Sequence, residues 1–219
     1  MNTKTVGATN RAKSQQETHA ALVKSGAALI AKNGYSGASV RDISSKAGFT
    51  QGAFYSNFAS KDDLVFAIMR AQFQEAYISI SKIENSQSES PAELAQEATA
   101  WLMDFFISDE KALLDTEIAL HAIRDEKFAS TYNELVAEHA QKMVSLLQKI
   151  ADASELETCA PTEQVAKGMI ALSRGLKLMA PRNDQNSIRD ILHVFLEAIF
   201  QQSPDSDTGQ KCVSHSLNS

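Results

Sequence analysis

Apolar residues recur every three or four positions along most of the chain, which is the spacing of one buried face of an α-helix. One such series runs from Phe128 to Ile150, and another runs from Ile188 to Phe200. No stretch of useful length alternates apolar and polar residues, and no Asn-Gly or Asp-Gly pair joins two such stretches. The pattern therefore predicts an all-α protein.

The first part of the chain is predicted to form four helices with short connections, over 14–32, 40–47, 51–57 and 61–83. Gly34 follows the first helix, while Ser39 and Thr50 are residue types that cap the two short helices. Gly48 suits the left-handed residue of a sharp turn between them. Two short helices joined in this way have the dimensions of a helix-turn-helix.

The rest of the chain is predicted to be helical up to residue 202, with Pro91 at the first position of one helix. Further helices are predicted over 112–123, from Phe128, between Pro161 and Pro181, and over 186–202. The polar segment 203–219 has no periodicity and is predicted to be disordered. The predicted divisions are a flexible arm (1–13), a helix-turn-helix domain (14–60), a larger helical domain (61–202) and this tail.

The net charge of −6 hides a strong asymmetry along the chain. Residues 1–61 carry eight basic and two acidic side chains, a net charge of +6, and the remaining 13 basic and 25 acidic side chains give −12. A cationic N-terminal part on an anionic remainder indicates a head that binds a polyanion. The charge division thus agrees with the position of the helix-turn-helix.

Other classes of protein find little support in the sequence. Cys159 and Cys212 cannot form a disulfide framework, no apolar segment resembles a signal peptide, and no window is long enough to span a membrane. The five histidines lack metal-ligand spacing, and neither a GxSxG motif nor a glycine-rich phosphate loop occurs. We therefore expect a soluble cytoplasmic protein with no metal or cofactor, and not an enzyme.

The second short helix has the chemistry of a DNA-reading element. A helix-turn-helix lays its second helix in the major groove with its N-terminal residues toward the bases. Here Gln51 can hydrogen-bond a base edge, and Gly52 and Ala53 are small enough for the backbone to approach DNA. Polar groups for phosphates or bases follow on Tyr55, Ser56 and Asn57. Phe54 is expected to point inward and form a small core with Ile43, Phe49 and Phe58.

The run GYSGASVRDISSKAGFTQGAFYSNFASKDDL resembles the N-terminal DNA-binding domain of the TetR/AcrR family of bacterial transcriptional regulators. The resemblance covers roughly residues 15–65, and the rest of the chain matches only in helix number and length. The matching positions are Gly34-Tyr35, Ser39, Ile43, Ala47-Gly48, Gly52, Phe54-Tyr55, Phe58 and Lys61. Val40 departs from the family, where a hydroxyl residue is common, so one phosphate contact fewer is expected there.

The resemblance implies a homodimer whose two heads bind a palindromic operator, generally as a repressor, and release it when a small molecule enters the C-terminal domain. It implies base contacts by Arg41 and Gln51, and phosphate contacts by Ser39, Tyr55, Asn57 and Lys61. The full predicted DNA-binding set is Ser39, Arg41, Thr50, Gln51, Gly52, Ala53, Tyr55, Ser56, Asn57 and Lys61.

The larger domain is expected to hold the effector and the dimer interface. Its candidate pocket residues are largely apolar or aromatic, which favours a lipophilic or aromatic effector: Met69, Phe73, Trp101, Phe105, His121, Tyr132 and His139. The last two helices expose more apolar surface than one neighbour would cover, which favours a four-helix interface between two chains. The predicted interface residues are Met169, Leu172, Leu176, Ile188, Ile191, Leu192, Phe195 and Ile199.

Each of these assignments has a plainer alternative. Apolar residues at helical spacing form ordinary core, and His121 and His139 can be satisfied buried histidines. The chain as a whole can be a helical enzyme or small-molecule carrier whose helix-turn-helix is incidental, or a protein that binds DNA without specificity. Within the family, an activator or a dual regulator is the alternative to a repressor.

Overall fold

The computed structural model describes residues 4–84, 109–153, 156–158, 160–179, 190–191, 194–195, 198 and 200–202. The described residues are almost entirely helical, which confirms the predicted fold class. The elements are α1 Lys4–Gly37, α2 Val40–Lys46, α3 Gln51–Tyr55, α4 Lys61–Glu84, α6 Asp109–Arg124, α7 Glu126–Ala153, β1 Leu156–Thr158, α8 Thr162–Met179 and β2 Phe200–Gln202. The helix predicted at Pro91 and the tail from Ser203 lie outside the described residues.

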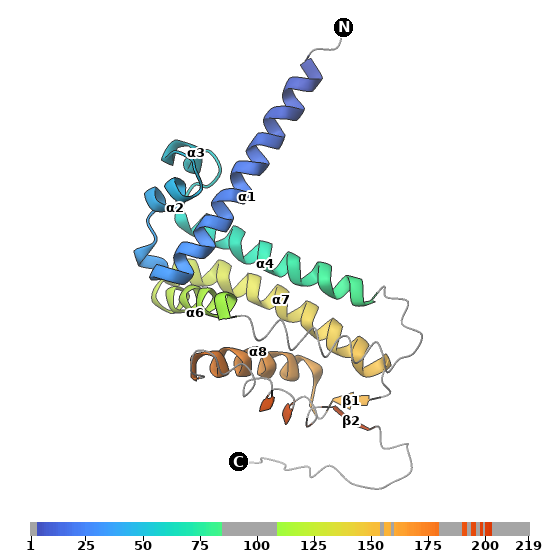
Figure 1. Cartoon of the computed structure of the whole chain (residues 1–219). Coiled ribbons are helices and arrows are strands. Elements are labelled where there is room, and N and C mark those ends of the chain that lie inside the picture. The colour runs from blue at the N-terminus through green and yellow to red at the C-terminus, as the bar shows by residue number, and fades with distance from the viewer. Residues whose placement is uncertain are drawn as a thin grey trace.

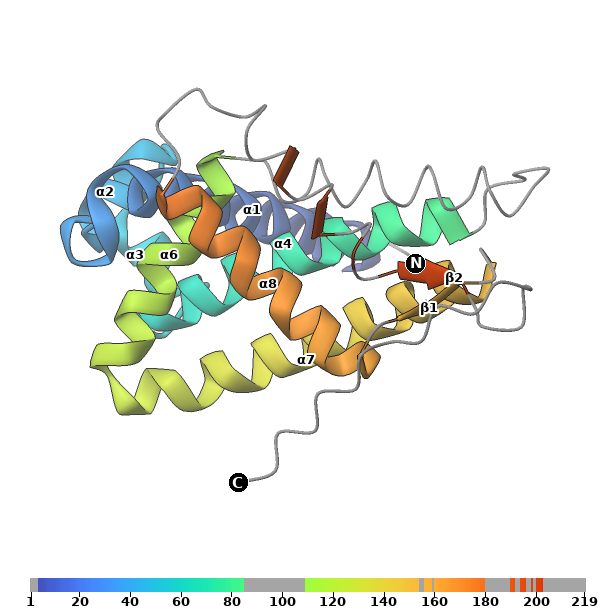
Figure 2. The ribbon, with the colours of Figure 1, turned by 90° about the horizontal axis from the view of Figure 1, so that it is seen from below.

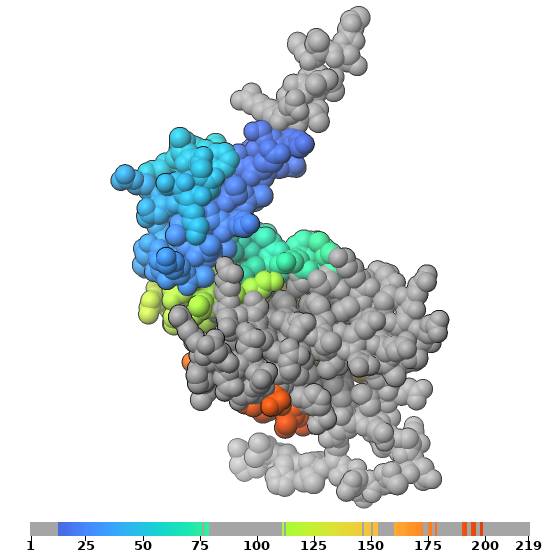
Figure 3. All heavy atoms as spheres, in the orientation of Figure 1, coloured from blue at the N-terminus to red at the C-terminus, as the bar shows by residue number. Residues whose placement is uncertain are grey.

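The helices form two regions, which we call the head and the body. The head consists of α1, α2 and α3, and the body consists of α4, α6, α7 and α8 (Figure 1). In the body, α7 packs against α4, α6 and α8, and Figure 2 shows α8 lying obliquely to α7. Figure 3 shows the head as a lobe that stands out from the body. The structure contains no described helix that is both long enough and apolar enough to cross a membrane.

The first helix is longer than its apolar pattern predicts. It begins at Lys4 rather than at Ser14, so the residues predicted as a flexible arm are helical from Lys4 onward. Extending an existing helix costs far less than nucleating a new one, and no proline interrupts this segment. At the other end the backbone leaves helical geometry at Gly34, with φ 78° and ψ 165°, where the sequence predicts the stop. A short helical stretch then continues to Gly37.

Two short strands were not predicted from the pattern. Strand β1 pairs antiparallel with β2, with Leu156 opposite Gln202 and Thr158 opposite Phe200. Three residues are too few for an alternating pattern to be recognised, so only the pairing identifies these strands. The prediction of helix over 186–202 is wrong at its end, because Phe200–Gln202 form β2. The strand pair closes the part of the body next to the end of α7.

The head and the body share one continuous apolar core. Buried residues of α1, such as Leu22 and Ile30, belong to the same cluster as Leu64 of α4 and Ile118 of α6. At Gly26 a Cβ atom would lie 2.7 Å from Cδ2 of Leu64, so the absence of a side chain lets α1 and α4 approach closely. The shared core means that a shift of α4 or α6 is transmitted directly to α1.

Candidate nucleic-acid interface and its junction with the body

The two short helices have the cap and turn geometry that the sequence predicts. The Ser39 hydroxyl oxygen accepts a hydrogen bond from the amide of Asp42 at 3.1 Å, and that of Thr50 accepts one from Ala53 at 3.2 Å. Gly48 lies between the helices with φ 80°, a left-handed conformation that favours glycine. These local bonds set the angle between α2 and α3 before any contact with the body.

A small apolar core holds α3 in place. Phe54 and Ile43 are fully buried, and Phe58 is nearly so. The Ser25 hydroxyl of α1 donates a buried hydrogen bond of 3.0 Å to the carbonyl of Ile43, which ties α2 to α1. Phe49 does not join this core, because 37% of it is exposed. That part of the prediction is wrong, since Phe49 sits in the turn before α3 and not on its inner face.

The residues predicted to contact DNA lie together on the outside of the head. Ser39, Arg41, Thr50, Gln51, Gly52, Tyr55 and Ser56 are exposed, and Ala53, Asn57 and Lys61 are half-buried. Tyr55 is 58% exposed, so it is free to meet a partner. Among the described residues, Arg41 takes part in no ion pair, which argues against its only role being a salt bridge with Glu17 or Asp42. The amide nitrogen of Asn57 donates to the Ala53 carbonyl at 2.8 Å, so this side chain has an internal bond as well.

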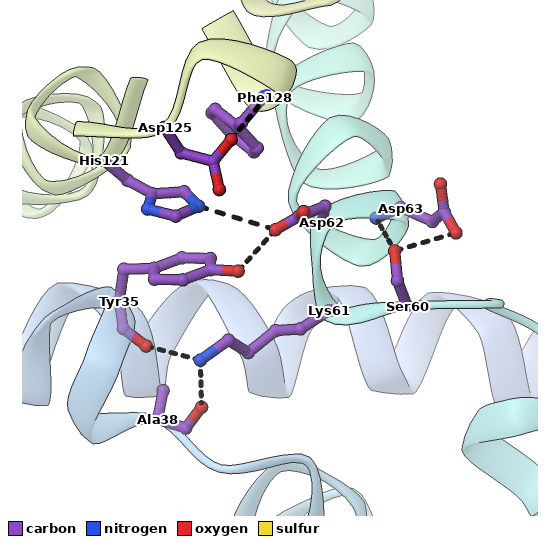
Figure 4. Close-up of polar contacts among 9 residues, drawn as sticks. All are labelled: Tyr35, Ala38, Ser60, Lys61, Asp62, Asp63, His121, Asp125 and Phe128. Atoms are coloured by element: carbon purple, nitrogen blue, oxygen red, sulfur yellow. Dashed lines mark hydrogen bonds and ion pairs between the residues drawn. The ribbon is translucent and has the colours of Figure 1, made fainter. Parts of the chain in front are cut away.

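Lys61 makes contacts within the chain that the sequence did not reveal. Its Nζ donates to the carbonyl oxygens of Tyr35 at 2.8 Å and of Ala38 at 3.2 Å, and lies 4.0 Å from the centre of the Tyr35 ring (Figure 4). Burial lowers the pKa of the Lys61 ammonium group, while the neighbouring Asp62 carboxylate acts in the opposite direction. Lys61 thus fastens the start of α4 to the end of α1, which is a structural role beside the predicted phosphate contact.

Three side chains from three helices meet next to Lys61. The Tyr35 hydroxyl donates to Oδ1 of Asp62, and Nε2 of His121 lies 3.5 Å from the same oxygen (Figure 4). The rings of Tyr35 and His121 stack with centroids 3.6 Å apart and planes 14° from parallel. The backbone N–H of Tyr35 also donates to Oε2 of Glu117 at 3.3 Å. We call Tyr35, Lys61, Asp62, Glu117 and His121 the junction.

The junction joins the head to α6 through polar groups that are partly buried. Burial, followed by the hydrogen bond to Asp62, raises the pKa of the Tyr35 hydroxyl, so this proton stays in place at physiological pH. The buried Nε2 of His121 has no partner of hydrogen-bond geometry among the described residues. His121 was predicted to line the effector pocket, and the structure places it at this junction and on the wall of the cavity beside it. Periodicity puts it correctly on a buried face of α6, but cannot show which helix it faces.

A surface cavity of about 480 Å³ opens beside the junction, between the end of α1 and α6. Its wall is largely polar, with side chains of both signs: Lys32, Asn33, Tyr35, Glu117, His121 and Arg124. It therefore lacks the apolar lining predicted for the effector site. Among the residues that the structure describes, no group of three side chains could hold a metal ion.

Inside the body, a second aromatic cluster surrounds His139. The His139 ring stacks on Phe73 with centroids 4.1 Å apart, and its Nδ1 lies 3.1 Å from the hydroxyl of Tyr77. Burial, and then the charge of Glu138, raises the pKa of Tyr77 to about 12, and Nζ of Lys142 lies 3.7 Å from the Tyr77 ring centre. Tyr77 was missed by the sequence reasoning, although its spacing of four residues from Phe73 places it on the same side of α4.

The other predicted pocket residues divide between this cluster and the core. Met69 and Tyr132 are buried within the continuous core, while Phe73 is half-buried at its edge. Trp101 and Phe105 lie outside the described residues. The structure thus brings Phe73 and His139 together, leaves Met69 and Tyr132 in ordinary packing, and separates His121 from the set.

The predicted dimer residues differ in how far their side chains are exposed in the single chain. Met169 is only 3% exposed, so its side chain packs within the chain. Leu172 and Leu176 are half-buried, while Ile191 and Phe195 are exposed. Leu178 and Val194, which were not predicted, are also exposed. Ile188, Leu192 and Ile199 lie outside the residues whose side chains the structure describes.

Comparison with known proteins agrees with this geometry. Residues 22–68 match the family model for bacterial regulatory proteins of the tetR family. The chain is 23% identical over 168 residues to the uncharacterized HTH-type transcriptional regulator YwcC of Bacillus subtilis, covering 74% of this chain and 75% of that protein.

Solved structures reproduce the fold over most of the chain. One is described as a TetR-family transcriptional regulator from Rhodococcus sp., with a TM-score of 0.72, 20% identity, and coverage of 85% of this chain and 100% of the other. A second is a transcriptional regulator from Saccharomonospora viridis in complex with choline, with a TM-score of 0.66, 17% identity, and coverage of 85% and 100%.

The fold and the exposed second helix define a helix-turn-helix protein that binds DNA. Residues 22–68 match the DNA-binding domain of the tetR family of bacterial regulatory proteins, so the head of this chain is of that type. The resemblance noted from the sequence is confirmed, and the proteins to which the chain is similar are regulators and not enzymes.

Proposed function

We propose that this protein is a ligand-responsive repressor, which binds a palindromic operator as a homodimer in the cytoplasm and releases it when a small effector enters the body. The observation that carries the proposal is the pairing of an exposed recognition helix with a junction that links the head to α6. The exposed helix supplies DNA binding, and the junction supplies a route by which the body can reposition the head.

The head binds DNA with α3 in the major groove. Gln51 at the first position of α3 and Arg41 on α2 are exposed, and both side chains form paired hydrogen bonds with base edges in other proteins. Ser39, Tyr55 and the cationic surroundings contact phosphates and set the register. One head makes few contacts, so two heads on one dimer are needed to bind both half-sites with useful affinity.

The dimer forms through the last helices of the body. Leu178, Ile191, Val194 and Phe195 expose apolar surface there, with Phe195 47% and Val194 62% exposed. Such side chains become buried when the same faces of two chains meet around a twofold axis. Palindromic operators match this symmetry, because each half-site meets one head.

The effector binds in the body near the cluster formed by Phe73, Tyr77 and His139. The stacked rings offer aromatic surface, and the Tyr77–His139 pair offers a polar group for orientation. A small lipophilic or aromatic molecule with one polar atom fits this chemistry. A regulator of the same fold was solved in complex with choline, which supports a small-molecule effector.

Release of DNA follows from the junction. An effector that separates α4 from α7 moves the start of α4, where Lys61 and Asp62 hold the end of α1. The two heads then lose the spacing that fits successive major grooves, and the affinity for the operator falls. An effector produces this change only to the extent that it binds the shifted arrangement more tightly.

Selection of bound DNA from a random pool with the full chain tests the proposal. We expect a palindromic site to be enriched, and we expect Arg41→Ala and Gln51→Ala each to weaken binding to that site by about 1–3 kcal/mol. Gln141→Ala, which removes an exposed body residue, is the matched control and leaves binding unchanged. Enrichment of no site, or equal affinity for random DNA, contradicts a specific regulator and favours a carrier or a non-specific binder.

A further inference from the structure

The surface cavity beside the junction is a feature that the proposed function leaves unused. It has a volume of about 480 Å³ and lies between the last residues of α1 and one face of α6. Its described wall includes none of Phe73, Tyr77 and His139, which are proposed above to hold the effector. Small-molecule sites in proteins have volumes of roughly 300–1,000 Å³. The cavity is therefore large enough for a ligand of its own.

The α6 side of the cavity carries side chains of opposite charge. Leu113, Glu117, His121 and Arg124 line it, and their spacing of three or four residues places them on one face of the helix. Glu117 and Arg124 are two helical turns apart, which is about 10 Å along the helix axis. A carboxylate and a guanidinium group thus belong to one wall with a defined interval between them.

The charged groups of the wall are available to a ligand. Lys32 and Arg124 are both exposed, and neither forms an ion pair with another residue of the described part of the chain. Oε2 of Glu117 accepts a hydrogen bond of 3.3 Å from the Tyr35 amide, whereas Oε1 accepts none from a described residue. The wall can therefore bind a carboxylate at one place and an ammonium group at another.

The rest of the wall suits amide groups. Asn33 and Ser36, at the end of α1, supply a side-chain amide and a hydroxyl. His121 uses Nε2 toward the junction, and Figure 4 shows its other ring nitrogen turned away from that contact. A Cβ at Gly34 would lie 3.0 Å from Oε2 of Glu117, so the absence of a side chain lets this carboxylate lie against the backbone. Hydrogen-bond donors and acceptors thus surround the two charged places.

We infer that this cavity binds a short peptide of about two residues. The carboxylate of the peptide pairs with Arg124, its ammonium group pairs with Glu117, and Lys32 adds positive potential. An extended chain of two residues is about 7 Å long, so with a hydrogen bond of about 3 Å at each end it spans the interval between the two charges. A free α-amino acid carries its charges too close together to reach both. Leu113, which is 46% exposed, offers apolar surface to a peptide side chain.

A peptide in this cavity also strengthens the link between head and body. Glu117 and His121 belong to the junction, while Lys32 and Asn33 belong to the end of α1. One ligand therefore contacts α1 and α6 together, at a place separate from the proposed effector position. The inference goes beyond the proposed function, because peptide binding requires no DNA.

Calorimetric titration of the full chain with a panel of dipeptides tests the inference. We expect at least one dipeptide to bind, and we expect its acetylated and amidated form, which lacks both charges, not to bind. For that dipeptide, Glu117→Gln should raise Kd about tenfold, because a half-buried charged acceptor is lost. Arg124→Gln, at an exposed position, should raise Kd about fivefold. Arg70→Gln, at an exposed position of α4, is the matched control and leaves Kd unchanged.

Several outcomes would overturn the inference: no dipeptide of the panel binds the wild-type chain, the capped form binds equally well, or Kd is unchanged in both cavity variants. An equal loss in Arg70→Gln also overturns it, because that indicates a general effect of charge. Glu117→Gln keeps an acceptor for the Tyr35 amide, and NMR of the wild-type chain gives a reading that needs no variant. The amide signals of residues 33–36 should shift on binding, and shifts confined to other residues contradict the site. The selection of bound DNA tests the proposed function separately, so either idea can fail alone.

Discussion

Nε2 of His121 lies 3.5 Å from Oδ1 of Asp62, although His121 is in the last turn of α6 and Asp62 is in the first turn of α4. The same oxygen accepts a hydrogen bond from the Tyr35 hydroxyl at the end of α1. The Asp62 carboxylate therefore lies between α1, which belongs to the head, and α6, which belongs to the body. This contact is the physical link that the proposed regulation requires.

A double-mutant cycle measures this link. We expect Asp62→Asn and His121→Phe to destabilise the chain by less in combination than their separate effects predict, with an interaction free energy of about 0.5–3 kcal/mol. His121→Phe keeps the stacking on Tyr35 and removes the ring nitrogens. Urea unfolding of the four chains gives the value. Simple additivity of the two single variants would show that the contact carries no coupling.

Gly34 should be among the most sensitive glycines of the head. Its φ of 78° is unfavourable for any other residue type, and an added Cβ would lie 3.0 Å from Oε2 of Glu117. We expect Gly34→Ala to lower the free energy of unfolding by about 1–2 kcal/mol. Gly168→Ala is the control in α8, where a Cβ meets no atom within 4 Å. That variant should stabilise the helix by up to about 1 kcal/mol, and a loss of stability there would count against this account.

Stability should fall in alkaline solution. The folded chain holds the proton of Tyr77 up to a pKa of about 12, and burial also raises the pKa of Tyr35. The unfolded chain releases both protons near pH 10, so above that pH it binds fewer protons than the folded chain and the free energy of unfolding decreases. Urea unfolding between pH 8 and pH 11 measures the decrease. Tyr77→Phe should reduce the slope, because it removes one of the two hydroxyl groups whose pKa is raised in the folded chain.

Lys61 should affect stability and DNA binding together. Its Nζ donates to the carbonyls of Tyr35 and Ala38, so Lys61→Met leaves both without that partner and should cost about 1–3 kcal/mol of unfolding free energy. Operator and random DNA should both be bound more weakly, because the contact is not to bases. Lys46→Met, at an exposed position of α2, is the control for loss of one charge in the head. Unchanged stability of Lys61→Met would mean that water replaces both bonds without cost.

The local features of the head could be predicted because their determinants are neighbours in the chain. Ser39 and Thr50 cap helices through amides three residues later, and Gly48 turns the backbone by itself. Phe54 lies on the inner face of α3 because helical spacing sets that face. The charge division between head and body likewise needed only the sequence.

The contacts between helices could not be predicted in this way. Periodicity placed His121 and Met169 on buried faces, but the structure alone decides that His121 meets Asp62 and that Met169 packs within the chain. Glu117 accepts from Tyr35 across 82 positions of the sequence, a separation over which no local pattern operates.

The class of fold, the reading helix and the cationic head follow from the amino-acid sequence alone, since they depend on helical periodicity, capping and charge. The meeting of Tyr35, Asp62 and His121, and the continuation of α1 as a helix back to Lys4, emerge only in three dimensions. Contacts such as the junction depend on the packing of side chains from distant segments into one dense core, where the available space selects the partners.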